Sequence, residues 1–97
     1  MGVGERFAPF EKGVSKMLVE KIRSVVGLDG VFNTTITLVK ETEPCGFVSY
    51  RIYTVNDYNH ERVYIYRSLS LNDAETWLGW TLEDWVALGC ELKEVSI

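Results

Sequence analysis

Few side chains in this 97-residue sequence are of the types that catalyse reactions, and they do not converge on one motif. His60 is the only histidine, and it lies close in the sequence to Asp57 and Glu61. A histidine beside a carboxylate can act as an acid–base pair. Polar residues of the same types are also typical of an exposed turn between two strands, and we favour that interpretation.

The adjacent acids Glu83 and Asp84 could suggest carboxylate or metal chemistry. Neighbouring side chains on a helix point about 100° apart, and acids near the start of a helix are favoured by its dipole, so a structural role explains this pair. The sequence contains no Gly-rich phosphate loop and no nucleophile elbow, and Cys45 and Cys90 are its only cysteines. We therefore expect a non-enzymatic protein with no catalytic residue, no metal site and no cofactor.

Tryptophan is concentrated near the C-terminus, where Trp77, Trp80 and Trp85 fall within nine residues. If these residues form one helix, Trp77 and Trp85 join its apolar arc and are core residues. Trp80 falls beyond the edge of that arc, among acidic residues. It is then an exposed anchor for a partner protein or, if the helix breaks at Gly79, a core residue, and the sequence leaves both alternatives open.

Acidic charge is concentrated in the same region. Residues 68–97 contain six acids and one base, a balance of −5, residues 1–67 contain eight acids and nine bases, a balance of +1, and the sum is −4. An acidic surface with a tryptophan attracts basic protein surfaces and repels nucleic acid, although a solvated helix face has the same composition. We predict an inhibitor or adaptor that occupies a basic, nucleic-acid-handling surface of a partner protein. The predicted partner-binding residues are Asp73, Glu75, Trp80, Glu83 and Asp84.

A second candidate surface is rich in tyrosine and arginine. Side chains of these types stack on bases and contact phosphates, which is how sheet-face RNA-binding proteins work. Packing between neighbouring strands uses the same residues, and we favour this interpretation over direct nucleic-acid binding. The residues of this alternative nucleic-acid face are Arg51, Tyr53, Arg62, Tyr64 and Tyr66.

The elements that must position these residues follow from the spacing of the apolar side chains. Over residues 10–26 apolar side chains recur at three- and four-residue steps, which predicts a helix that ends at Gly27. A second helical region follows in the last third of the chain. Either Ser70 or Asn72 caps one helix over residues 71–88, or two short helices meet near Gly79.

Three strands are predicted between these helical regions. Their sequences are rich in β-branched and aromatic residues, and the polar loop 57–60 joins the second and third strands as a hairpin. A four-residue loop places Tyr53 beside Tyr64 on one face of the hairpin and Ile52 opposite Ile65 on the other. The predicted strands cover residues 31–41, 47–56 and 61–69, and residues 90–97 add a short strand or trail along the core.

The resulting order predicts an α+β fold of the type α-β-β-β-α, with both helices on one face of a three-stranded antiparallel sheet. A chain of this length holds one core, so we expect a flexible arm over residues 1–9 and a single domain over residues 10–97. The composition, 46% hydrophobic and 25% charged, is that of a globular protein. With neither an apolar stretch of about 18 residues nor a secretory signal, we expect a cytoplasmic protein that makes no membrane contact.

In size, acidity and element order the chain resembles the small inhibitors that phages encode against host systems, including anti-CRISPR proteins. Several proteins of that loose group present acidic surfaces that occupy nucleic-acid-binding sites, some of them as DNA mimics. The resemblance implies a phage protein that acts in the host cytoplasm, and it transfers no individual residue. The element order also resembles the double-stranded-RNA-binding domain, but residues 72–76 lack the lysine run that opens the second helix of that family.

Overall fold

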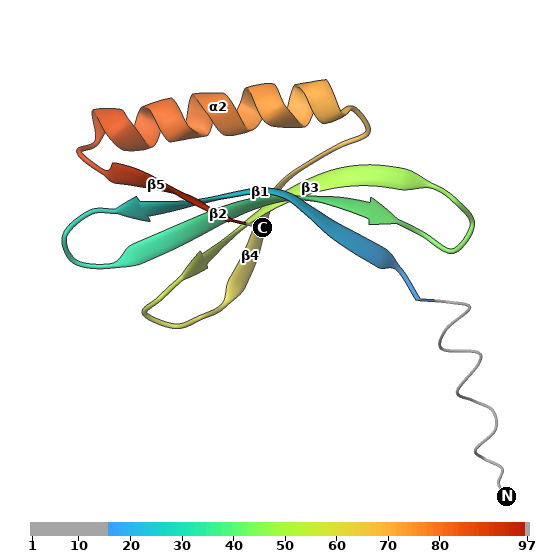
Figure 1. The fold of residues 1–97 in the computed structure, drawn as a ribbon, viewed down its shortest axis with the longest axis horizontal. Helices are drawn as coiled ribbons and strands as arrows, with labels where there is room; N and C mark the ends of the chain where they lie inside the picture. Colours follow the sequence, from blue (N-terminus) through green and yellow to red (C-terminus); the bar gives the residue numbers. More distant parts are fainter. Residues whose placement is uncertain (1–15, 97) are drawn as a thin grey trace, which may run out of the picture.

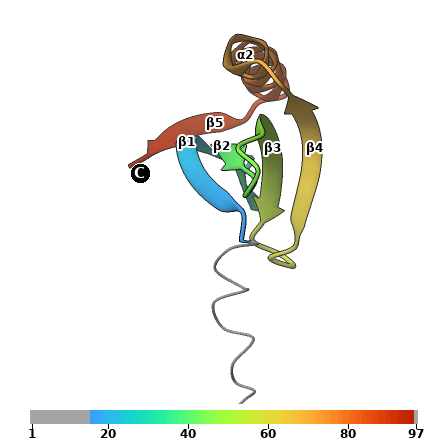
Figure 2. The same ribbon diagram turned by 90° about the vertical axis from the view of Figure 1, so that its right-hand side faces the viewer.

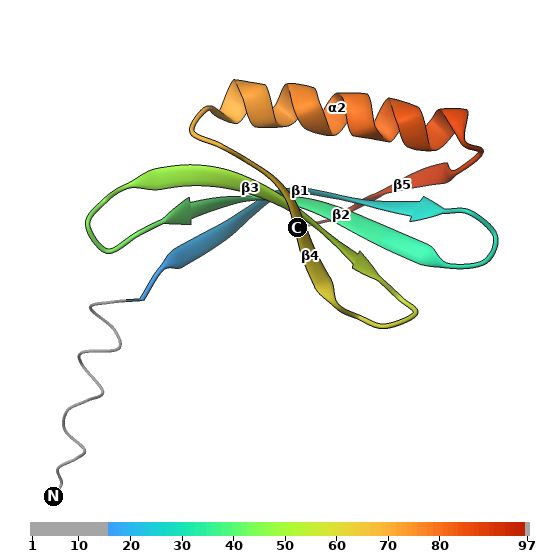
Figure 3. The ribbon, with the colours of Figure 1, turned by 180° about the vertical axis from the view of Figure 1, so that it is seen from behind.

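The computed structural model describes residues 16–96 and shows a twisted antiparallel sheet with one helix packed against it (Figure 1). The strands lie side by side in the order β4-β3-β2-β1-β5. The helix α2 lies on one side of the sheet, as the end-on view and the view from behind both show (Figures 2 and 3). In chain order the elements are β1 (Leu18–Leu28), β2 (Asn33–Thr42), β3 (Val48–Asn56), β4 (Arg62–Ser68), α2 (Leu71–Ala87) and β5 (Glu91–Val95).

The predicted α-β-β-β-α fold with a three-stranded sheet is wrong. The sheet has five strands, because residues 18–28 form β1 where the sequence predicted a helix, and β5 pairs with the free edge of β1. The first part of that predicted helix, residues 10–15, lies outside the described residues, as does the predicted arm over residues 1–9.

A β-bulge explains why β1 has the apolar spacing of a helix. The pairing of β1 with β2 shifts between Lys21 and Arg23, which makes Ile22 an extra residue in the strand. The extra residue allows Ile22 and Val25 both to pack against the core, although alternation in a regular strand would put them on opposite faces. The three-residue step that predicted a helical stripe therefore belongs to a bulged strand.

The core lies between α2 and the inner face of the sheet, which is the face toward the helix. Ile36 and Leu38 of β2 share this face and are both fully buried there. Each large apolar side chain buried in this way stabilises the fold by about 1.5–3 kcal/mol. The buried core residues are Val25, Ile36, Leu38, Ile52, Ala74, Leu78 and Leu82.

The register predicted for the β3–β4 hairpin is confirmed next to the loop and wrong farther from it. Tyr53 pairs with Tyr64 as predicted, but the register then shifts by one residue. Because Ile65 is an extra residue in β4, Ile52 lies opposite Tyr66 and not opposite Ile65. The bulge therefore moves Tyr66 to the inner face, where it packs against the core.

The helix α2 is continuous over 17 residues, so the alternative with two short helices meeting at Gly79 is wrong. Ser70 caps its N-terminus, because the Ser70 Oγ accepts a hydrogen bond of 3.2 Å from the backbone N–H of Asp73. Gly89 follows the helix with a φ of 97°, a conformation that favours glycine. Among residues 16–96, no helix has the length and apolar character needed to cross a membrane.

Candidate functional site

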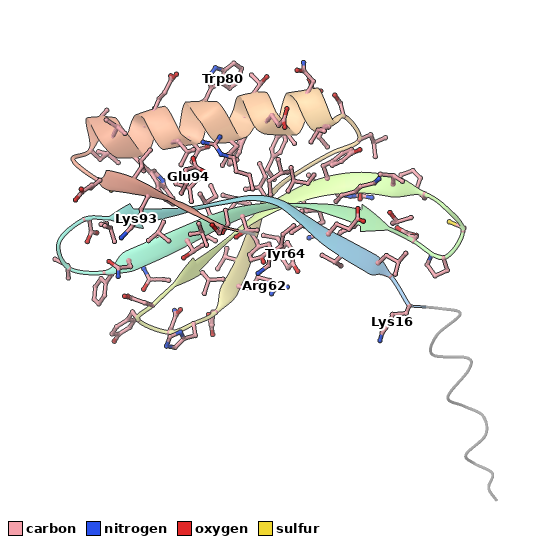
Figure 4. The ribbon with its side chains drawn as sticks, viewed as in Figure 1. Lys16, Arg62, Tyr64, Trp80, Lys93 and Glu94 are labelled. Carbon is pink, nitrogen blue, oxygen red and sulfur yellow. The ribbon has the colours of Figure 1, made fainter. Side chains whose placement is uncertain are left out.

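Trp80 projects from α2 on the side that faces away from the sheet (Figure 4). Its exposed fraction is 62%, which is unusually high for a tryptophan. Ala74 and Leu78 form the buried stripe of the same continuous helix, and the 100° step of a helix turns Trp80 away from that stripe. The alternative in which Trp80 folds into the core is therefore wrong.

The other two tryptophans attach α2 to the sheet. Trp77 stacks on Tyr66 of β4 with ring centroids 4.7 Å apart and 12° between the ring planes. Trp85 lies so close to β1 that a Cβ on Gly27 would stand 2.5 Å from the Trp85 Cε3 atom. Both rings pack against the core, as predicted. Together these contacts fix the rotation of the helix and thus the direction in which Trp80 points.

Three acids surround Trp80 on the exposed side of α2. With 100° between successive residues, Asp73 lies about 20° and Asp84 about 40° from Trp80 around the helix axis. Glu83 lies about 60° away in the opposite sense. All three acids are exposed, and α2 contains no lysine or arginine. We name Asp73, Trp80, Glu83 and Asp84 the acidic helix face.

Glu75, which was predicted for the same surface, is not beside Trp80. It lies about 140° from Trp80 around the axis, on the side of α2 nearer to Arg23 of β1. Arg23 is in turn held by Glu94 of β5. The Arg23 Nε donates to the Glu94 Oε1 at 3.3 Å, and the Arg23 Nη2 donates to the Glu94 Oε2. The structure therefore brings four of the five predicted residues together and places the fifth next to a different cluster.

The ion pair between Arg23 and Glu94 shifts both groups toward their charged forms. The side-chain hydrogen bond from Arg23 lowers the pKa of Glu94, and the same bond, with the charges of Glu94 and Glu75, raises the pKa of Arg23. Sequence reasoning missed this pair because it assigned Arg23 to a helix. Its signal is long-range, since β1 and β5 pair across about seventy residues of chain.

A groove of about 410 Å³ lies between α2 and the part of the sheet formed by β1 and β5. The groove is open toward solvent at Gly79, because this residue has no side chain and a Cβ there would meet no atom within 4 Å. Glu83 belongs both to the groove and to the acidic helix face. The residues that line the groove are Arg23, Gly79, Leu82, Glu83, Val86 and Leu92.

The outer sheet face, which points away from α2, carries four of the five predicted tyrosine and arginine residues as an interlocked stack. The Arg62 Cζ lies 4.2 Å from the ring centroid of Tyr53, and the Arg51 Cζ lies 4.0 Å from that of Tyr64. The two tyrosine rings are 5.6 Å apart. Arg51 Nη1 is also 3.8 Å from a carboxylate oxygen of Glu41. These contacts are cross-strand packing, and they leave Arg62 and Tyr64 exposed on the surface (Figure 4).

Tyr66, the fifth residue predicted for the outer sheet face, is on the inner face. The bulge at Ile65 reverses its direction relative to Tyr64, and its ring stacks on Trp77. The predicted position of Tyr66 is therefore wrong, for the same reason as the predicted register.

Bases that sequence reasoning did not single out complete the outer sheet face. The register places Lys21, Arg51 and Arg67 in one row across the sheet, with Val39 between Lys21 and Arg51. Lys93 of β5 lies in the row that ends at Arg62. Regular alternation from the buried Val25 would have put Lys21 on the inner face, and the bulge at Ile22 brings it to the outer face. By register, the charged strand residues of this face are Lys21, Arg51, Arg62, Arg67 and Lys93 against Glu41 and Glu91.

The residues that could take part in catalysis do not lie together in one site. His60 is exposed in the β3–β4 loop with a φ of 61°, and Cys45 is exposed in the β2–β3 turn. Within residues 16–96, no group of three or more histidine, cysteine, aspartate or glutamate side chains could hold a metal ion.

Comparisons with protein-family models, with curated proteins and with solved structures found no match to this chain. The resemblance to phage-encoded inhibitors stays a prediction, and the element order on which it partly depended differs from the order in the structure.

Proposed function

We propose that this protein is a non-enzymatic inhibitor or adaptor that binds another protein through the acidic helix face. The observation that carries the proposal is the 62% exposure of Trp80 on a continuous, well-anchored helix. Tryptophan supplies a large apolar area with only two side-chain torsions to fix, which makes it a frequent anchor of protein interfaces. The anchoring of α2 by Trp77 and Trp85 holds Trp80 in place before any partner arrives.

The charge around Trp80 selects a basic partner. Asp73, Glu83 and Asp84 form a charged rim around an apolar centre, which is the usual anatomy of a protein interface. A basic surface would be steered toward this rim and aligned on it, whereas another acidic surface would be repelled. Because α2 carries no base, the rim offers no compensating attraction to acidic proteins.

A nucleic-acid-handling protein is the partner class that fits this chemistry best. Such proteins carry basic grooves that neutralise phosphates, and carboxylates along a helix can occupy the same positions. Binding there would exclude the nucleic acid from its own site. In this form the proposal includes the phage-encoded, anti-CRISPR or DNA-mimic type of inhibitor that the sequence resembles.

The test is a quantitative affinity capture with the full chain from nuclease-treated cell extract. We compare the unchanged protein with Trp80→Ala, with the double variant Asp73→Lys and Asp84→Lys, and with the control Glu91→Lys, which makes one such charge reversal on β5. Loss of an interface anchor costs about 2 kcal/mol or more, so Trp80→Ala should weaken partner binding by about 30-fold. The double variant should abolish capture, and the control should retain it.

Circular dichroism of each variant checks that α2 and the sheet are still formed. Recovery of the same proteins in the same amounts by all four chains would contradict the proposal. So would a partner lost only in Glu91→Lys, because Glu91 lies on β5 and not on α2.

A second candidate function is nucleic-acid binding by the outer sheet face. It is favoured by the lysine and arginine side chains that the register places there. Arg62 and Arg67 are exposed and can reach phosphates, and Tyr64 can stack on a base. Fluorescence polarisation with single-stranded DNA and RNA oligonucleotides tests it. Changing Arg62 and Arg67 to alanine should lower the slope of log affinity against log salt by about one per lost phosphate contact. An unchanged slope would contradict this candidate.

A further inference from the structure

We infer that the groove beside Gly79 receives the cationic side chain of an arginine or lysine from the basic partner. The inference rests on the proposed function, because it concerns a partner that already covers Trp80. It adds a second recognition element, located between α2 and the β1–β5 part of the sheet, to the surface around Trp80.

The first observation is that Gly79 leaves a gap between two acidic side chains of α2, Glu75 and Glu83. Residues four positions apart lie nearly above one another along a helix, so Glu75, Gly79 and Glu83 form one row on α2. Gly79 has no side chain, and the space beside it is open, since a Cβ there would meet no atom within 4 Å. The row therefore has an opening between two carboxylates, and this opening leads into the groove of about 410 Å³.

The second observation is the apolar lining of the groove. Leu82 and Val86 of α2 and Leu92 of β5 contribute aliphatic surface to it. Val86 is 55% exposed, so this surface is open to a partner. The methylene stem of arginine or lysine packs well on such a surface while the charged end reaches a polar rim.

The third observation is the charge around the groove. Arg23 lines it, but the edge of its guanidinium group formed by Nε and Nη2 is paired with the Glu94 carboxylate, which offsets its charge. Counting Arg23 against Glu75, Glu83 and Glu94 gives one base and three acids, a local balance of −2. A carboxylate or phosphate ligand would meet these uncompensated acids, whereas a cation would pair with Glu83. The groove therefore fits a cationic side chain.

The position of the groove connects it to the acidic helix face. Gly79 precedes Trp80 in the chain, and Glu83 borders both the groove and the surroundings of Trp80. A partner surface that covers Trp80 thus presents its neighbouring side chains to the groove. A basic residue beside the tryptophan-binding site of the partner can enter it without any rearrangement of α2.

The test is an NMR titration of the ¹⁵N-labelled full chain with N-acetyl-arginine methylamide. Two comparison ligands have similar length: the citrulline derivative, which is neutral but polar, and the norleucine derivative, which is apolar. We expect the largest shift changes at the backbone amides of Gly79, Val86 and Leu92. We expect the citrulline and norleucine derivatives to bind at least about threefold more weakly, as for loss of one partly exposed charge pair.

Variants localise the effect. Glu83→Gln should weaken the arginine derivative by a similar factor, whereas the matched control Asp73→Asn, on the same helix but away from the groove, should not. Gly79→Leu fills the opening and should remove the shift changes at Leu92. Equal binding of all three ligands, or equal affinity in Glu83→Gln and Asp73→Asn, would overturn the inference.

The two proposals fail in different ways. If Trp80→Ala loses the captured partner while the arginine derivative leaves the groove amides unmoved, the groove inference is overturned and the proposed function stands. If Trp80→Ala still captures the partner, the proposed function is overturned. The inference that a basic residue of this partner enters the groove is then overturned as well.

Discussion

Two glycines on facing elements, Gly27 of β1 and Gly79 of α2, differ in whether the structure has room for a side chain. At Gly27 the backbone of β1 passes directly under the ring of Trp85, and a Cβ would stand 2.5 Å from Cε3 and 2.7 Å from Cζ3. At Gly79, in the middle of α2, a Cβ would meet nothing within 4 Å. The first glycine is required by packing, whereas the second is a cost to the helix that packing does not explain.

Alanine at these two positions should therefore change stability in opposite directions. Gly27→Ala forces Trp85 or β1 to move and should lower the free energy of unfolding by about 1–3 kcal/mol, the usual cost of overpacking. Gly79→Ala should raise the free energy of unfolding by about 0.5–1 kcal/mol through the better helix propensity of alanine. Equilibrium unfolding in urea measures both changes. Equal effects of the two substitutions would show that the contact of Trp85 with β1 is not close.

Asp29 gives the β1–β2 turn a dependence on pH. Its Oδ1 accepts hydrogen bonds of 2.8 Å from the backbone N–H groups of Val31 and Phe32, and these bonds, that from Val31 first, lower the pKa of Asp29. A carboxyl whose pKa is lowered by folding stabilises the protein above its ordinary pKa, about pH 4. That stabilisation is lost as the pH falls through the lowered value in the folded state.

We therefore expect Asp29→Ala to destabilise the protein at neutral pH and to have little effect at strongly acidic pH. Urea unfolding of both proteins across this range measures the difference. The control is Asp57→Ala, which changes an exposed aspartate of the β3–β4 loop. A difference between Asp29→Ala and the unchanged protein that stays constant with pH would contradict the assignment.

At the scale of elements, regular segments could be predicted from the sequence and bulged ones could not. The strands β2, β3 and β4 are rich in β-branched and aromatic residues and alternate cleanly near the β3–β4 loop, so their existence and the Tyr53–Tyr64 pair were predictable. The bulges at Ile22 and Ile65 each add one residue and reverse the alternation beyond them. The first bulge made a strand look like a helix, and the second put Tyr66 on the wrong face.

The candidate site was predictable to the extent that it lies on one helix. Asp73, Glu83 and Asp84 were predicted because their spacing around α2 depends on the sequence of α2 alone. The exposure of Trp80 depended on the continuity of the helix, which is a property of its tertiary contacts. The groove could not be predicted, because Arg23 and Leu92 reach it from two strands that are far apart in the chain.

The N-terminal cap of α2 should make a measurable contribution to stability. Ser70 Oγ accepts the N–H of Asp73, and replacing such a cap by alanine costs about 1 kcal/mol. We expect Ser70→Ala to lower the free energy of unfolding by about this amount, measured by urea unfolding. Asn72→Ala, an exposed change in the first turn, is the matched control and should have a much smaller effect. A larger effect of Asn72→Ala would assign the cap to Asn72, the alternative that the sequence left open.

In the whole molecule, β4 is an edge strand of the sheet, so a second copy of the protein could pair with it. Val63, Tyr64 and Ile65 are all exposed, and such an edge is a template for another strand. Antiparallel pairing of β4 with a second copy, centred between Tyr64 and Ile65, would place Arg62 opposite the Arg67 of the other copy. Like charges directly opposite are destabilising, and the bulge at Ile65 further interrupts the ladder.

Removing both charges should therefore promote self-association. We expect the double variant Arg62→Thr and Arg67→Thr to form dimers or larger species at concentrations where the unchanged protein does not, as measured by sedimentation velocity. The control is Lys21→Thr, which removes a base from the same face but not from β4. Self-association of the control to the same degree would show that the loss of a base from the outer sheet face, and not the exposure of the β4 edge, promotes pairing.

The acidic helix and the basic outer sheet face lie on opposite sides of the molecule, as the positions of Trp80 and Arg62 show (Figure 4). This separation gives a protein of net charge −4 a permanent electric moment that runs across the sheet. A charged surface therefore exerts a torque on the molecule before contact, within the Debye length of about 8 Å at physiological salt. A basic partner turns it helix first, and a polyanion turns it sheet first. The orientation of an encounter is thus set by the sign of the approaching surface.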